Sequence, residues 1–90
     1  MIAKVLLASG SDVTEALCRD ISVGGMQVLT DLIPGKVGEK IRLNVSAAQI
    51  EAFVAEGVIV RILEDQKGFS FRFDKLSESA RRSIEEYINS

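Results

Sequence analysis

Residues 20 to 25, Asp-Ile-Ser-Val-Gly-Gly, form the stretch of this chain whose residue types could do chemistry. A carboxylate, a hydroxyl and two glycines meet there, between extended apolar runs at 14 to 19 and 26 to 30. A carboxylate accepts hydrogen bonds, a hydroxyl donates or accepts them, and glycine lets another molecule approach the backbone. The pattern predicts a hairpin corner that faces a ligand. The predicted ligand-binding residues are Asp20, Ser22 and Gly25, with Arg19 and Gly24 as weaker candidates.

A purely structural interpretation of the same corner is also open. Asp20 and Ser22 could bond nearby backbone amides in an Asx-type turn, with Gly24 or Gly25 supplying a positive φ. The motif taken alone does not separate a structural corner from a ligand-facing one.

Other chemistry has little support. The chain has no histidine and one cysteine, so the commonest general base is missing and an internal disulfide is impossible. Cys18, in an apolar strand, is interpreted as a small buried hydrophobe rather than a nucleophile. Some carboxylates are available for acid–base work but have no partner at a meaningful spacing: Asp12, Glu15, Asp20 and Asp65. We predict a protein that is not an enzyme, with no catalytic residue, metal site or cofactor.

Composition indicates one globular domain over residues 1–90, with 47% apolar and 27% charged residues. A net charge of -2 with scattered lysines and arginines argues against nucleic-acid binding. No run approaches the roughly 18 apolar residues of a membrane span, and residues 1–9 lack the features of a signal peptide. We therefore expect a cytoplasmic location and no direct membrane insertion.

Turn formers divide the chain into short extended runs. The runs expected as strands are residues 2–8, 13–19, 26–30, 40–45, 53–63 and 69–73. The connections expected are a turn at 9–12, a break at 33–35, a short helical turn or loop at 46–50 and a hairpin loop at 64–68. The strand at 53–63 is expected to bend at Gly57, with an inner face of Val58, Val60 and Ile62.

Period-two alternation marks the core strands most clearly. Ile41, Leu43 and Val45 are expected to face inward, and so are the three phenylalanines at 69, 71 and 73. From Ser77, a capping residue, apolar residues recur at helical spacing up to residue 88. The fold class predicted is mainly β: a small six-stranded antiparallel barrel, or a sandwich, with one C-terminal α-helix covering an open edge.

With this order of strands and helix around it, the sequence of the corner resembles that of the PilZ domain family, the bacterial cyclic di-GMP receptor domains. One signature of that family is Asp or Asn, any residue, Ser, any two residues, then Gly, which Asp20, Ser22 and Gly25 satisfy in full. Several other features are similar to the family along residues 13 to 90. They are apolar Ile21 and Met26, Pro34-Gly35, the late strands at 57–61 and 68–73, and a closing helix with Arg81, Ile84, Tyr87 and Ile88.

The resemblance implies a split barrel and a non-catalytic regulatory module of second-messenger signalling. It implies that Asp20 and Ser22 hydrogen-bond a guanine edge of cyclic di-GMP, and that Gly25 keeps the turn open. It also implies an output through a partner protein or a fused effector domain.

The second signature of the family, a pair of arginines four residues apart upstream of the turn, is missing. No arginine precedes Arg19, and the only basic side chain among residues 1–9 is that of Lys4. Each charge-assisted hydrogen bond lost in this way is worth roughly 1.5–3 kcal/mol. Either the pair precedes this chain in a longer protein, or the domain is a degenerate one that binds a protein instead of the nucleotide. In the second case an exposed strand edge, or a face of Leu17, Leu29 and Ile59, would dock the partner.

Overall fold

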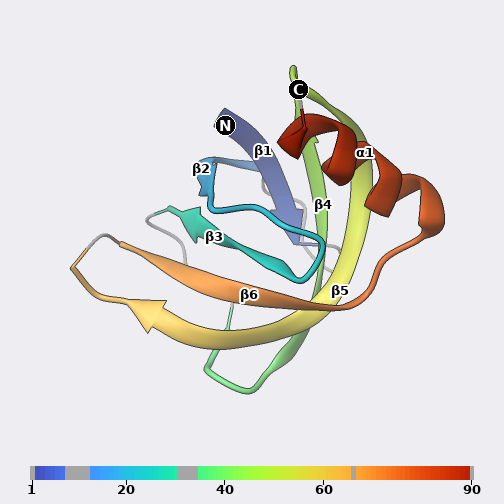
Figure 1. Cartoon of the computed structure of the whole chain (residues 1–90). Coiled ribbons are helices and arrows are strands. Elements are labelled where there is room, and N and C mark those ends of the chain that lie inside the picture. The colour runs from blue at the N-terminus through green and yellow to red at the C-terminus, as the bar shows by residue number, and fades with distance from the viewer. Residues whose placement is uncertain (1, 8–12, 31–34, 66, 90) are drawn as a thin grey trace.

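The computed structural model describes residues 2–7, 13–30, 35–65 and 67–89, which form strands followed by one helix (Figure 1). The strands are β1 (Ile2–Leu7), β2 (Val13–Arg19), β3 (Gly25–Leu29), β4 (Lys40–Ala47), β5 (Ile50–Leu63) and β6 (Gly68–Lys75). Helix α1 (Glu78–Ile88) ends the chain. The turn predicted at 9–12, the end of the first predicted strand at residue 8 and the break at 33–34 lie outside the described residues.

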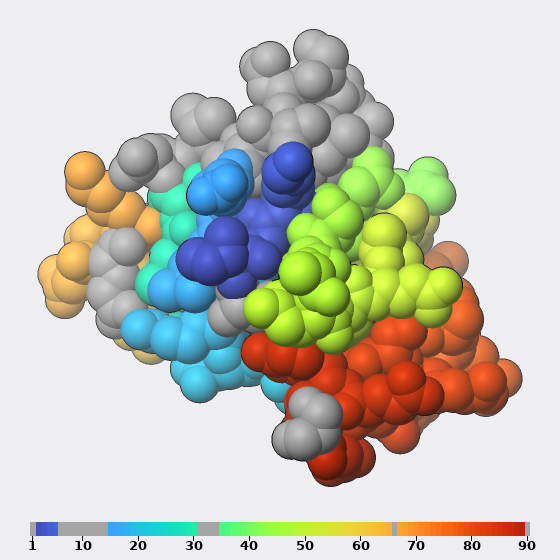
Figure 2. Space-filling view, turned by 90° about the horizontal axis from the view of Figure 1, so that it is seen from above, coloured from blue at the N-terminus to red at the C-terminus, as the bar shows by residue number. Residues whose placement is uncertain are grey.

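The strands close into a six-stranded barrel in the order β1-β2-β3-β6-β5-β4, and all neighbours are antiparallel. The prediction of a six-stranded antiparallel barrel with a C-terminal helix is confirmed. The helix does not cover an open edge as predicted, because pairing of β1 with β4, with Val5 opposite Val45, joins the two ends of the sheet. Helix α1 instead packs on β5 through Ala80 and Ile84 (Figures 1 and 2).

Alternating residues of the strands fill the barrel. Ile41, Leu43 and Val45 of β4 are all buried, as the alternation predicts. On β6, Phe69 and Phe71 are each 1% exposed, while Phe73 is half-buried and packs against the core. Phenylalanines inside the barrel cannot stack on the bases of a nucleic acid, so their assignment to the core is confirmed.

The inner face predicted for β5 is wrong at two positions. Val58 is only half-buried and Val60 is 42% exposed, whereas Ile59 is fully buried. The pairing with β6 explains the reversal, because Ile59 lies opposite Phe71 and Arg61 opposite Ser70, which leaves Val60 as an extra residue at a bulge. A bulge reverses which side chains face inward, so Ile62 beyond it packs against the core as predicted.

The connections on either side of β5 are short. Strand β4 runs to Ala47 and β5 begins at Ile50, three residues earlier than predicted, so a two-residue turn replaces the helical turn considered for 46–50. At the helix, Ser77 Oγ accepts the Ala80 N–H at 3.1 Å, which confirms the predicted cap.

Candidate ligand-binding site

The predicted corner is the turn between β2 and β3. The Ser22 N–H donates to the Gly25 carbonyl at 2.8 Å, and the Ser22 hydroxyl accepts the Gly24 N–H at 3.2 Å. The Ser22 Oγ also lies 3.5 Å from the Gly25 carbonyl oxygen, within donating distance. The structural interpretation of the corner therefore holds for Ser22, whose hydroxyl is engaged by the turn itself.

Asp20 behaves differently from Ser22. Its φ is +52°, so Asp20 takes the left-handed conformation that the structural interpretation assigned to Gly24 or Gly25. Adjacent side chains of a regular strand point to opposite faces, yet Asp20 Oδ2 lies 3.9 Å from Arg19 Nε, because the left-handed residue turns the chain. The Asp20 side chain is 71% exposed, and no described backbone amide donates to its carboxylate.

Arg19 is held on the outer face of the barrel by the next strand. Arg19 lies opposite Gln27 in the pairing of β2 with β3. Gln27 Oε1 accepts hydrogen bonds from Arg19 Nε at 3.2 Å and from Nη2 at 2.9 Å. Two of the predicted site residues, Arg19 and Asp20, are therefore opposite charges side by side at the turn, with Arg19 fixed by Gln27 and its Nε 3.9 Å from Asp20 Oδ2.

The two glycines of the turn have different surroundings. Gly25 lies opposite Arg72 of β6, and a Cβ at Gly25 would overlap the carbonyl oxygen of Phe71. A Cβ at Gly24 would meet only the Ser22 hydroxyl, at an ordinary 3.7 Å. The carbonyl of Gly24 accepts the Phe73 N–H at 2.9 Å and ties the turn to β6. Gly25 is therefore required by strand packing, whatever its part in ligand binding.

Arg72 is a candidate that the sequence pattern did not single out. It lies on the outer face opposite Gly25, is 61% exposed, and its Nε is 3.6 Å from Asp74 Oδ1. Alternation with Phe71 and Phe73 indicates that Arg72 faces outward. Only the register between β3 and β6 places it beside the turn.

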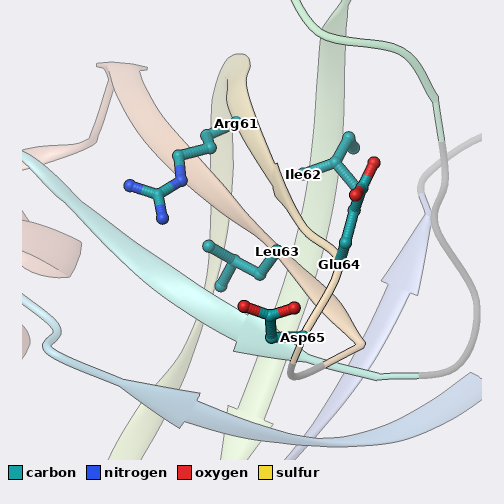
Figure 3. Close-up of a pocket in the computed structure, with 5 residues that line it drawn as sticks. All are labelled: Arg61, Ile62, Leu63, Glu64 and Asp65. Carbon is teal, nitrogen blue, oxygen red and sulfur yellow. The ribbon is translucent and has the colours of Figure 1, made fainter.

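Residues 19–25 do not line either of two hollows among the described residues. One hollow lies at the end of β5, where Arg61, Leu63 and Asp65 point to one side and Ile62 and Glu64 to the other (Figure 3). A second lies between β1, β2 and the β4–β5 turn. The side chains of Arg19 and Asp20 are 42% and 71% exposed on the outside of the barrel.

The family model of the PilZ domain matches residues 1–90, which is the whole chain. The chain belongs to the PilZ domain family. A comparison with curated proteins gives no match. PilZ is a family of cyclic di-GMP-binding regulatory domains, and the Asp-x-Ser-x-x-Gly signature of this PilZ domain lies at the β2–β3 turn.

Two further findings concern the described part of the PilZ domain. It contains no group of three or more histidine, cysteine, aspartate or glutamate residues that could hold a metal ion. Its single helix, at 11 residues, is too short to cross a membrane.

Cys18 of the PilZ domain faces the barrel interior, not the turn. It is 1% exposed, and burial raises the pKa of its thiol to about 11. We predict that a thiol reagent at pH 8 labels the folded domain far more slowly than the urea-unfolded one, because the thiolate is the reactive form. Equal labelling rates for folded and unfolded protein would contradict the prediction.

The raised pKa of Cys18 also makes stability depend on pH. The contribution of this thiol to the free energy of unfolding is fully present below about pH 9 and is lost as the pH rises to about 11, because the thiol ionises more readily in the unfolded chain.

Proposed function

We propose that this PilZ domain is a non-catalytic regulatory module that binds cyclic di-GMP on the outer face of the β2–β3 turn. It passes the signal to a partner protein or a fused effector domain in the cytoplasm, where we expect such a second messenger to act. The observation that carries the proposal is the Asp20 carboxylate, which is 71% exposed and turned beside Arg19 by its left-handed backbone.

The chemistry of the turn suits a guanine nucleotide. A carboxylate accepts from N1 and N2 of guanine, and a guanidinium donates to phosphate oxygens or stacks on a purine face. Arg19 and Arg72 are cations on the same outer surface, and Val23 at the turn offers apolar contact with 37% exposure. These arginines could take over part of the work of the family's upstream pair, which is not found in residues 1–18.

A second candidate is a PilZ domain that binds a protein and no nucleotide. The outer face favours it at one place, where Ile2 is 58% exposed opposite Leu17, and Leu17 is 37% exposed opposite Leu29. Ile59, which the sequence predicted on this face, is fully buried and cannot belong to it.

Calorimetric titration with cyclic di-GMP tests the first candidate, and Asp20→Asn is the informative variant. Asparagine keeps the shape of Asp20 and tolerates a positive φ, so the melting temperature should stay within a few degrees while affinity falls about tenfold or more. Asp20→Ala should weaken binding as much, and in addition lower the free energy of unfolding by about 1 kcal/mol, since alanine disfavours that φ.

Two outcomes would count against nucleotide binding at the turn. Folded wild-type protein that gives no heat at ligand concentrations up to about 1 mM leaves only the protein-binding candidate. Wild-type affinity in Asp20→Asn would place the nucleotide somewhere other than at the Asp20 carboxylate.

A further inference from the structure

Gln27 stands at the middle of β3 on the outer face, between Arg19 of β2 and Ser70 of β6. Its Oε1 accepts two hydrogen bonds from one guanidinium, at 3.2 Å from Nε and 2.9 Å from Nη2. Arg19 is 42% exposed, so packing alone does not fix its long side chain. Two bonds from one edge of the guanidinium to a neighbouring strand restrict both its position and the plane of its fork.

The arrangement sets a donor group beside an acceptor group. Arg19 Nε lies 3.9 Å from Asp20 Oδ2, and both side chains are exposed at the turn. Guanine presents the matching pattern, because O6 and N7 accept hydrogen bonds and the adjacent N1 and N2 donate them. Adenine carries a donor at N6 where guanine has the O6 acceptor, and its N1 carries no proton. The contact of Arg19 at position 6 and the contact of Asp20 at N1 would therefore both be mismatched.

We propose that Gln27 is the positioning residue that holds Arg19 toward O6 and N7 of the guanine that Asp20 contacts in the proposed function. Asp20 accepts from N1 and N2 of the same base. The inference rests on the proposed function, since it requires a guanine nucleotide at the turn. A neutral amide suits this role because a glutamate at position 27 would compete with the ligand for the charge of Arg19.

A double-mutant cycle tests the role of Gln27. Cyclic di-GMP affinity is measured by calorimetry for wild type, Arg19→Met, Gln27→Met and the double variant. Each single change should weaken binding about tenfold, as expected for loss or misplacement of a charge-assisted contact. The double variant should bind no more weakly than Arg19→Met, because Gln27 acts only through Arg19.

The matched control is Ser70→Ala, which alters the other cross-strand neighbour of Gln27 and should leave affinity unchanged. Gln27→Asn, a smaller change, provides a second variant should Gln27→Met fail to fold; its shorter side chain should also weaken binding.

A cyclic di-GMP analogue with 7-deazaguanine bases reports the base contact directly. Removing N7 should weaken binding to wild type several-fold and should change little in Gln27→Met.

The possible failures are distinguishable. Wild-type protein that binds cyclic di-GMP, with additive losses in the cycle or an equal 7-deaza effect in Gln27→Met, overturns the role of Gln27 and leaves the proposed function standing. Wild-type protein that binds cyclic di-AMP as tightly as cyclic di-GMP overturns the guanine-reading pair. Wild-type protein that binds neither nucleotide overturns the proposed function and this inference together.

Discussion

Gly25→Ala is expected to lower the free energy of unfolding by about 1–3 kcal/mol, the usual cost of forcing an extra methyl group into a packed site. The new Cβ would overlap the Phe71 carbonyl oxygen and lie 3.3 Å from Arg72 Cα, both of which belong to the backbone of β6. A backbone cannot swing aside as the end of a side chain can, so β3 and β6 must move apart at the start of their pairing. Affinity for cyclic di-GMP should fall with stability, since the same displacement disturbs the turn.

Gly24→Ala is the matched control, one residue away in the same turn. Its Cβ would meet only the Ser22 hydroxyl at 3.7 Å, and Gly24 does not have a positive φ. Its stability should stay within about 0.5 kcal/mol of wild type. Urea denaturation of the three proteins, followed by circular dichroism, measures the difference. Equal stability of the two variants would show that β3 and β6 are not as close at Gly25 as the structure has them.

Phe71→Ala is expected to have the largest effect of any change considered, a loss of about 3–5 kcal/mol in the free energy of unfolding. Phe71 is 1% exposed and packs edge-on against both neighbours of its face, with centroid distances of 6.4 Å to Phe69 and 5.7 Å to Phe73. A domain of this size has only about 5–15 kcal/mol of stability in total. A substantial unfolded population at 37 °C is therefore expected.

Phe73→Ala is the control for ring removal from the same strand. Phe73 is only half-buried, so its loss should cost less than that of Phe71, and the two transition midpoints in urea should differ clearly. If both variants unfolded at the same urea concentration, the barrel interior would not be centred on Phe71.

Local pattern was sufficient for the parts of the fold where one face of an element is buried throughout. In β4 the buried Ile41 and Leu43 alternate with exposed Arg42, so a single strand shows which side faces inward. Strand β5 is apolar on both faces from Val58 to Val60, and alternation there has no unique solution. The pairing with β6 inserts a bulge at Val60, and that pairing decides which residues are buried.

The candidate site divides in the same way. The residue types of the turn and their spacing were sufficient to propose Asp20, Ser22 and Gly25, because the signature is contiguous along the chain. The sequence did not show which of these residues bonds within the turn and which faces solvent, because Ser22 and Asp20 both suit a turn. The left-handed backbone at Asp20 and the bonds of Ser22 within the turn separate their roles.

The amino-acid sequence alone was sufficient to predict the family, six strands followed by a C-terminal helix, and the place of the turn, because these follow from contiguous motifs and from periodicity within single elements. Closure of the barrel depends on the pairing of β1 with β4, which are far apart in the chain. The hydrogen bonds from Arg19 to Gln27 and the position of Arg72 beside Gly25 became visible in the folded chain, because each pair joins different strands. The tertiary structure also supplied the reason for Gly25, which is the close approach of β6. Strand register depends on the free energy of the whole barrel, and no local segment encodes it.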